Sequence, residues 1–325
     1  MTLYRKLIWY TKGLKEYTQS GYTEASKSFN PNDLNVDLSE KVCLITGANS
    51  GLGKSCAEHL SKLGAKIHMV CRDKKRAEEA LEELKEHTKS DKFVLHLLDL
   101  SKPSDVYRFG KQFSESEEKL DILINNAGCM INDLTYNSDG LEMNFVTNTL
   151  STYLLSESLI ESLNRSPNPR VVVVSSGGML LQKLDYSDVN FKIVGPKGFD
   201  GTMAYAQNKR QQVIMTTEWS KKYPKIKFFS MHPGWADTPA VASSMSSFYE
   251  KHKSRLRTVD QGSDTIVWLA ASEAAMSQPN GEFFQDRKVV SQHLWLAQTK
   301  SSESDIKSFM NILKNYQDKL CDGKY

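Results

Sequence analysis

The sequence has no strong excess of charge of either sign and no long uninterrupted apolar run. Lysine and arginine total 42 against 39 aspartate and glutamate residues, which gives a formal net charge of +3. A nucleic-acid-binding chain usually shows a basic excess or stripe, so this balance argues against that class. No apolar run approaches the roughly 20 residues that a membrane-spanning helix needs. With 39% hydrophobic and 25% charged residues, the composition is that of a globular chain with a large core.

Cysteines are few and irregularly spaced, and the sequence lacks metal-binding motifs. The five cysteines are Cys43, Cys56, Cys71, Cys129 and Cys321. Their odd number, the absence of C-x-x-C pairs and the position of Cys43 and Cys71 inside apolar runs predict free thiols in a reducing compartment. The seven histidines form no H-E-x-x-H motif, so we expect no metal site. We expect the chain to be cytoplasmic or peripheral on an intracellular membrane, and not secreted.

Residues 1–40 form an extension ahead of the main fold. Its helix-spaced apolar residues predict an amphipathic helix, while basic residues interrupt it too often for a signal peptide or a membrane span. The apolar positions are Leu3, Leu7, Tyr10, Leu14 and Tyr17. Packing of this helix on its own domain or on a partner is the simpler interpretation. The alternative is docking on a membrane surface through residues 1–20.

From residue 41 to residue 290, apolar runs alternate with helical patterns. The runs lie at 42–46, 66–71, 93–98, 120–125, 170–175 and 226–231, and the helical patterns at 51–63, 73–89, 103–116, 139–164 and 203–222. This order predicts an α/β fold, a Rossmann-type doubly wound parallel sheet in one domain. We expect a Gly-rich insertion at 177–202, a polar loop at 239–260 and a C-terminal tail at 291–325.

The first apolar run leads into a Gly-rich turn and then into a helix. The turn comprises Thr46, Gly47, Asn49, Ser50, Gly51, Leu52 and Gly53. Glycines in such a turn let the backbone approach a pyrophosphate, whose charge lies at the helix N-terminus. The rival interpretation is a P-loop, because Ala48 and Gly53-Lys54-Ser55 nearly match G-x4-G-K-[ST]. The first glycine of that pattern is missing, and no strand end clearly supplies a magnesium-binding acid.

The end of the second run bears on the choice of nucleotide. The strand ends at Cys71 without an acid, and Arg72 and Asp73 follow. An acid there would bond the ribose 2′-hydroxyl, whereas a guanidinium binds a 2′-phosphate in bidentate fashion. Arg72 therefore favours NADP(H) over NAD(H). The alternative is that Arg72 caps a helix and Asp73 bonds the ribose.

A tyrosine and a lysine at i, i+4 spacing form a candidate catalytic pair. Tyr205 and Lys209 fall on one face of the helix predicted at 203–222. A cation beside a phenol favours the phenolate and moves its pKa toward working pH. Tyr205 is therefore a candidate general acid/base for a carbonyl/alcohol pair.

These motifs follow one another in an order typical of one family. The Gly-rich turn, the N-N-A-G segment at 125–128, the Ser175-Ser176 pair, Y-x3-K and a following P-G resemble the short-chain dehydrogenase/reductase family over roughly residues 40–290. The resemblance implies NADP(H)-dependent hydride transfer between a carbonyl and an alcohol on an apolar substrate such as a lipid, retinoid or steroid. It implies that Tyr205 exchanges the substrate proton and that Lys209 binds the nicotinamide ribose and lowers the pKa of Tyr205.

The resemblance also implies roles for residues outside the tyrosine helix. Ser176, or alternatively Ser175, would hydrogen-bond the substrate carbonyl, and Asn148 would support a proton-relay water. The remaining cofactor-binding positions are Asp99 and Leu100 at the adenine, Asn126, Ala127 and Gly128 beside the cofactor, and Pro233, Gly234 and Thr238 at the nicotinamide amide.

The sequence departs from the family pattern in places and leaves a second function open. Ser151 stands where glycine is common, Asn208 replaces a frequent serine, and the stretch between Ser176 and Tyr205 is long. The alternative function is a catalytically silent NADP(H)-binding scaffold that acts through its N-terminal extension on a partner or a membrane surface. The substrate and the oligomeric state are not readable from the sequence.

Overall fold

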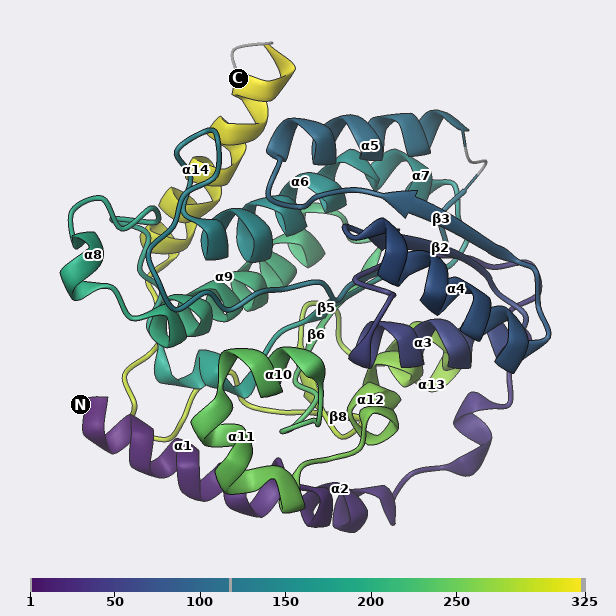
Figure 1. The fold of residues 1–325 in the computed structure, drawn as a ribbon, viewed down its shortest axis with the longest axis horizontal. Coiled ribbons are helices and arrows are strands. Elements are labelled where there is room, and N and C mark those ends of the chain that lie inside the picture. Colours follow the sequence, from purple (N-terminus) through teal and green to yellow (C-terminus); the bar gives the residue numbers. More distant parts are fainter. Residues whose placement is uncertain (1, 117–118, 323–325) are drawn as a thin grey trace.

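A central eight-stranded sheet organises the computed structural model, which describes residues 2–116 and 119–322 (Figure 1). The strand order is β3-β2-β1-β4-β5-β6-β7-β8, in which only the last pair is antiparallel. The strands are β1 Val42–Thr46, β2 Lys66–Cys71, β3 Phe93–Leu97, β4 Ile122–Asn125, β5 Arg170–Val174, β6 Lys227–Met231, β7 Phe283–Gln285 and β8 Lys288–Val289. The predicted Rossmann-type α/β fold is therefore confirmed.

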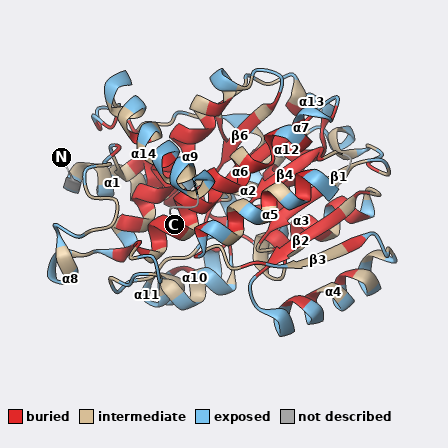
Figure 2. Ribbon diagram, turned by 90° about the horizontal axis from the view of Figure 1, so that it is seen from above, coloured by how far each residue is buried: buried red, intermediate tan, exposed pale blue. Residues whose placement is uncertain are grey.

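Side chains from alternate strand positions enter two different cores, as the period of a β-strand requires. Cys43 and Ile45 face one core, and Leu44 between them faces the other. The first core lies under helices α3 Gly51–Lys62, α4 Lys74–Thr88 and α12 Val259–Ala271. The second lies under α5 Pro103–Ser116, α6 Ser151–Ser158, α7 Ile160–Asn164 and α9 Gly201–Lys222. Figure 2 shows the sheet and the inner helices as the buried centre of the molecule.

The helical pattern expected at 139–164 contains a wider turn at its start. Residues Phe145–Leu150 (η2) are π-helical, and α6 and α7 follow. The carbonyl of Asn148 in this turn accepts bonds from Thr152 Oγ1 and Gln212 Nε2, both at 2.7 Å. Side chains therefore satisfy a carbonyl that the widened turn exposes, and such turns often occur at functional sites.

Short helices fill the insertion and the polar loop. They are η3 Gly177–Leu181 and α8 Gly195–Gly198 in the insertion, and α10 Pro239–Ser244, α11 Ser246–His252 and η4 Lys253–Arg255 in the loop; α13 Glu273–Met276 follows α12. The C-terminal residues expected as a tail contain α14 Glu303–Cys321, whose Phe309 and Leu313 are fully buried in the second core. The apolar face of α14 explains this packing, and the segment is part of the fold.

The N-terminal extension lies against the body of the protein. It contains α1 Thr2–Glu16, α2 Gln19–Ser26 and η1 Pro31–Leu34. Tyr17 is buried, and Tyr10 and Leu14 pack beside Trp235 and Phe248. Leu3 and Leu7 remain 82% and 60% exposed, so only the second half of the predicted apolar stripe is covered. No helix among the described residues is long and apolar enough to cross a bilayer.

Candidate active site

The Gly-rich turn has the geometry that a bound pyrophosphate requires. Gly47 and Gly51 have positive φ values of 66° and 51°, and a Cβ on Gly53 would lie 2.3 Å from the Gly47 carbonyl oxygen. Ser50 precedes α3 without a side-chain cap, which leaves backbone N–H groups of the first turn open to an anion. Asn49 and Leu52 lie in the same turn, both partly exposed. The turn thus fits a dinucleotide phosphate.

The N-N-A-G segment braces this turn across the sheet. Asn126 Nδ2 donates to the Thr46 carbonyl at 2.9 Å, and the backbone N–H groups of Asn126 and Ala127 donate to Thr46 Oγ1 at 3.0 Å. These bonds join the carboxyl ends of β1 and β4, where the strand order reverses. In open parallel sheets, ligands bind at that switch point.

The P-loop alternative does not fit the observed contacts. Lys54 forms an ion pair with Glu83 on α4 and so is committed away from the turn. Ser55 is buried and bonds Asp260 Oδ1 at 2.8 Å and Ser263 Oγ at 2.7 Å, both at the start of α12. A P-loop needs its lysine on phosphate and its hydroxyl on magnesium, so these two side chains serve helix packing instead.

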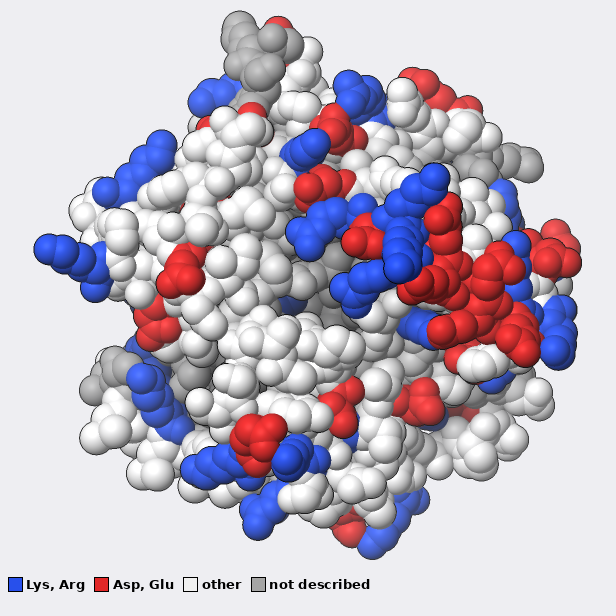
Figure 3. Space-filling model, in the orientation of Figure 1, with Lys and Arg blue, Asp and Glu red and all other residues white. Residues whose placement is uncertain are grey.

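Arg72 is exposed beside a pocket at the end of β2. The pocket holds about 380 Å³ and is also lined by Leu98, Asp99, Lys102 and Arg108. Figure 3 shows Lys and Arg side chains gathered along one rim of a central hollow, beside the ends of β2 and β3. This rim is an electrostatically suitable place for an added phosphate.

Asp73 and Asp99, two of the acids near this pocket, already accept local hydrogen bonds. Asp73 accepts the Arg76 N–H at 2.9 Å as the N-cap of α4, so it does not point freely to a ribose. Asp99 Oδ1 accepts the N–H and hydroxyl of Ser101, both at 2.9 Å, while Asp99 also lines the pocket. Leu100 follows it, and its carbonyl accepts a bond from Ser151. Ser151 therefore supports the loop that follows β3.

Tyr205 and Lys209 lie together on α9, which Asp200 caps. The Lys209 ammonium is 5.4 Å from the centre of the Tyr205 ring and donates to the Val174 carbonyl at 2.8 Å. Burial lowers the pKa of Lys209 to about 8. The expected lowering of the tyrosine pKa is wrong for this structure: burial, and to a lesser degree the Cys129 thiol, raise the pKa of Tyr205 to about 12, against a lowering hydrogen bond from Ser176. Desolvation of the phenolate outweighs the nearby cation.

The structure distinguishes the two serines. Ser175 is 2% exposed, and its hydroxyl donates to the Lys209 carbonyl at 2.9 Å. Ser176 is only half-buried, accepts the Gly178 N–H at 3.1 Å and reaches Tyr205. Ser175 therefore fastens α9 to the sheet, while Ser176 faces the tyrosine.

Asn148 lies beside Gly128. A Cβ on Gly128 would lie 3.1 Å from Asn148 Oδ1 and 3.5 Å from Lys209 Nζ, so the three residues meet. The Asn148 amide donates to and accepts from the backbone of Cys129, both at 2.8 Å. The side-chain amide of Asn208 lies 3.3 Å from Asn148 Nδ2. In these contacts Asn148 positions the loop after β4.

The segment that begins with Pro233-Gly234 reaches the Gly-rich turn at Thr238. Gly234 has a φ of 78°, and a Cβ there would lie 2.3 Å from Arg257 Nε. The Pro233 carbonyl accepts a bond from Arg257 at 3.3 Å. Thr238 caps α10, and its methyl would be 3.4 Å from a Cβ on Gly51. These contacts place Thr238 beside Gly51 of the Gly-rich turn.

The N-terminal extension also holds the turn that begins at Ser176, which we call the serine turn. The sequence did not indicate this contact. Trp9 Nε1 donates to the Gly177 carbonyl at 2.7 Å, and the Gly177 N–H donates to His232 Nδ1 at 2.8 Å. The ring of Tyr17 packs edge-on against His232, with 4.4 Å between centroids. Burial keeps the pKa of His232 well below its ordinary value, so this histidine is a neutral acceptor.

A buried ion pair ties the extension to the P-G segment. Arg257 bonds both carboxylate oxygens of Asp286, at 2.6 and 2.9 Å, and also donates to the carbonyls of Glu16 and Thr18. The bidentate geometry satisfies a guanidinium that is almost fully buried. Gly177, which follows Ser176, and the P-G segment are therefore both held in part by residues 9–18.

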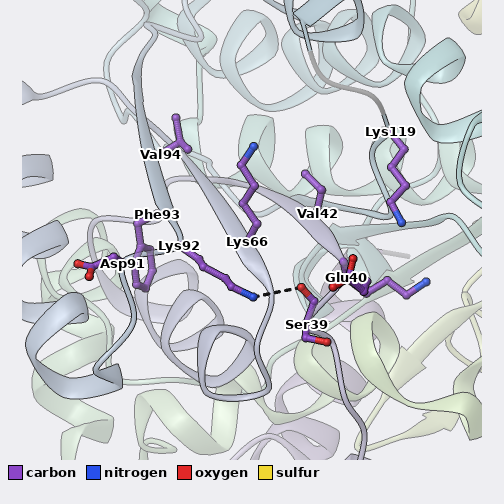
Figure 4. A pocket seen from close by; sticks show the side chains of 10 residues that line it. Ser39, Glu40, Val42, Lys66, Asp91, Lys92, Phe93, Val94 and Lys119 are labelled. Carbon is purple, nitrogen blue, oxygen red and sulfur yellow. Dashed lines mark hydrogen bonds between the residues drawn. The ribbon is translucent and has the colours of Figure 1, made fainter.

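A second pocket, of about 460 Å³, lies at the opposite edge of the sheet (Figure 4). It opens at the amino ends of the strands, between Lys66, Lys92 and Lys119. Lys92 donates to the Ser39 carbonyl at 3.2 Å, and Lys119 pairs with Asp121 at 3.6 Å. In this fold ligands bind at the carboxyl ends of the strands, so this pocket is not the cofactor site.

The described cysteine, histidine and acidic side chains form no candidate metal site. All five cysteines are free thiols, as predicted, and Cys43, Cys56 and Cys71 are buried. Among residues 2–116 and 119–322, no three His, Cys, Asp or Glu side chains group closely enough to hold a metal ion.

Comparison with known proteins assigns the class. Residues 41–185 match the family model described as short chain dehydrogenase. The chain belongs to the short-chain dehydrogenase/reductase family, whose members are NAD(P)-dependent oxidoreductases acting on CH–OH donors.

Individual relatives cover nearly the whole chain. Dehydrogenase/reductase SDR family member 12 of Homo sapiens is 49% identical, over 97% of this chain and 98% of that protein. Retinol dehydrogenase 12 of Homo sapiens is 32% identical, over 78% of this chain and 80% of its own length. A short chain dehydrogenase of Shigella flexneri solved with NADP has a TM-score of 0.62 at 18% identity, covering 79% of this chain and 100% of its own. The structural likeness concerns the fold.

Proposed function

We propose that the protein is an NADPH-dependent reductase of carbonyl groups on apolar molecules, with Tyr205 as the proton donor. The observation that carries this proposal is the group formed by Tyr205, Lys209 and Ser176 at the carboxyl edge of the sheet. Carbonyl reduction needs a proton at the oxygen, and a phenol that keeps its proton at neutral pH is a donor of the right kind.

Each of these side chains has one task in the reaction. Ser176, half-buried and facing Tyr205, holds the carbonyl oxygen by a hydrogen bond. Tyr205 delivers its proton to that oxygen. Lys209 stabilises the phenolate that remains, because a cation near the ring favours its charged form. Asn148 acts as a positioning residue through the backbone of Cys129.

The nicotinamide dinucleotide supplies the hydride when it is bound. The open N-terminus of α3 and the glycines at 47, 51 and 53 fit its pyrophosphate, and Lys209 would hold the nicotinamide ribose. NADPH is preferred over NADH because Arg72 is exposed beside the pocket at the end of β2, while Asp73 is occupied as the N-cap of α4.

The apolar substrate class rests on similarity rather than on a pocket shape. Relatives at 30–32% identity carry the name retinol dehydrogenase, in mouse and human. Lipid aldehydes, retinoids and steroids are therefore the classes to examine. We place the protein in the cytoplasm or at the surface of an intracellular membrane.

The test is reduction of a panel of such carbonyl compounds by the purified full chain with NADPH. Tyr205→Phe should lower kcat by about 10²- to 10⁴-fold while NADPH binding stays within about twofold. Tyr186→Phe is a matched control, because its hydroxyl bonds Asp305 at 3.2 Å. If the protein binds NADPH without turning over any substrate, and Tyr205→Phe changes no measurable property of cells, the proposal is wrong. The protein would then be a cofactor-binding scaffold.

A further inference from the structure

An uncovered apolar surface joins the start of α1 to the loop that precedes α14. Leu3, Leu7, Trp295 and Leu296 are 82%, 60%, 78% and 63% exposed. They lie in neighbouring segments, because Tyr4 on α1 donates its hydroxyl hydrogen to the Trp295 carbonyl at 2.9 Å. We call these four side chains the apolar patch. Large exposed apolar groups that gather in this way are uncommon on a soluble monomer and mark interaction surfaces.

The loop presents its two residues outward in a fixed conformation. Leu294 and Ala297 are buried on either side of them, at 7% and 1% exposure. Leu296 has a φ of 53°, a conformation that is costly for a branched side chain and needs support from its surroundings. Arg5 supplies this support by donating to the Ala297 carbonyl at 2.8 Å and to the Gln298 carbonyl at 3.4 Å. The exposure of Trp295 and Leu296 is thus built into the fold.

Charge around the apolar patch has one sign within the two segments that form it. Residues 2–15 and 288–302 contain Arg5, Lys6, Lys12, Lys15, Lys288 and Lys300 and no aspartate or glutamate. Lys6 and Lys300 are exposed. In Figure 3 the surface near the N-terminus, at the lower left, is largely uncharged, with basic and a few acidic side chains beside it. A second copy of the chain would bring these cations against each other, whereas anionic lipid headgroups would attract them.

We propose that the apolar patch docks the protein on an anionic membrane surface, with its leucines and tryptophan in the headgroup region and Lys6 and Lys300 against the lipid phosphates. Tryptophan and leucine flanked by lysine are the residues that favour this interface. The docking is peripheral, and it is independent of whether the enzyme turns over a substrate.

The test is flotation of the full chain with vesicles of phosphatidylcholine alone or with about 30 mol % phosphatidylserine. We expect the protein to float with the anionic vesicles and to be released by high salt. Leu3→Asp/Leu7→Asp/Trp295→Asp should weaken this binding by at least about tenfold. Lys6→Gln/Lys300→Gln, which leaves the apolar groups in place, should weaken it several-fold and reduce its salt dependence.

Thr23→Asp/Ser28→Asp is the matched control, since both residues are exposed in or just after α2, at the other end of the extension (Figure 1). This variant adds acidic charge to the same extension and should float like the wild type. NADPH binding by every variant shows that the fold is intact and keeps a folding failure, or a failure of the proposed reaction, apart from a docking failure.

Three results would overturn the proposal. The first is that the wild type stays at the bottom of the gradient with anionic vesicles. The second is that the aspartate variant floats as well as the wild type. The third is a wild-type dimer in solution that the aspartate variant dissociates, which would make the patch an interface between copies of the chain.

Discussion

The indole Nε1 of Trp9 donates a 2.7 Å hydrogen bond to the carbonyl of Gly177, which lies 168 residues further along the chain. Gly177 is the neighbour of Ser176, and its N–H is held by His232. The N-terminal extension therefore contacts the backbone that orients the proposed carbonyl-binding hydroxyl.

Removing the hydrogen bond from Trp9 to Gly177 should slow the reaction without weakening the binding of the cofactor. For Trp9→Phe we expect kcat to fall by about tenfold while KM for NADPH stays unchanged, because a misplaced Ser176 loses a bond that matters at the reacting oxygen. Steady-state kinetics measure both constants. Tyr4→Phe, on the same helix but bonded to the Trp295 carbonyl, serves as the control. Equal losses in both variants would mean that the helix acts only as a structural support.

Arg72 should decide between the two nucleotides. Arg72→Ala removes the exposed guanidinium at the β2 end, so we expect NADPH to bind about 10- to 100-fold more weakly and NADH to bind as before. Fluorescence titration of both nucleotides measures this. Arg76→Ala, also exposed but one turn further along α4, should leave both affinities unchanged. An unchanged ratio in Arg72→Ala would place the phosphate contact elsewhere.

Lys209 should make stability depend on pH in the alkaline range. Burial lowers its pKa from 10.5 to about 8 in the folded protein. Between these values the unfolded chain binds the extra proton, so stability rises with pH, and below about 8 the full cost of the buried charge is present. The Tm difference between Lys209→Met and the wild type should therefore shift against the variant by about 5 °C from pH 7 to pH 10.

The measurement for Lys209 is a thermal melt of the protein without nucleotide at both pH values. Lys225→Met provides the comparison, because Lys225 is exposed after the end of α9. Its Tm difference from the wild type should be the same at both pH values. A pH-independent difference for Lys209→Met would show that the lysine keeps its ordinary pKa in the folded protein.

The C-terminal helix should contribute to global stability. Phe309 on α14 is fully buried in the second core, so Phe309→Ala should lower the free energy of unfolding by about 3–5 kcal/mol. Urea unfolding followed by tryptophan fluorescence measures it. Lys307→Ala, exposed on the same helix, should change it by less than about 0.5 kcal/mol. Similar small effects for both variants would mean that α14 detaches at little cost.

The sequence was sufficient for the parts of the fold that carry strong local patterns. The six longest strands match the predicted apolar runs within a few residues, because strands buried on both faces read as continuous apolar stretches. The strand β7 Phe283–Gln285 is too short for such a pattern. Helix α12 did have a signal, since Thr258 and Gln261 form a capping box directly before its apolar face.

In the candidate active site, too, some contacts were predictable from the sequence and others were not. Tyr205 and Lys209 share a helix face, so their spacing predicted their proximity. The contacts of Trp9, Tyr17, His232 and Arg257 join distant segments and leave no periodic trace in one sequence. The pKa of Tyr205 also needed the structure, because burial decides its direction and spacing does not report burial.

The docking of α1 has a consequence for the order in which the chain folds. Its partners are Gly177, Leu181, the backbone of residues 295–298 and Arg257, which lie between 168 and 293 residues later. During synthesis this amphipathic helix precedes every surface that covers it, and it waits until nearly the whole chain has been made. Its closure onto the serine turn is thus a late step, and the active site is completed only when the first helix and one of the last loops meet.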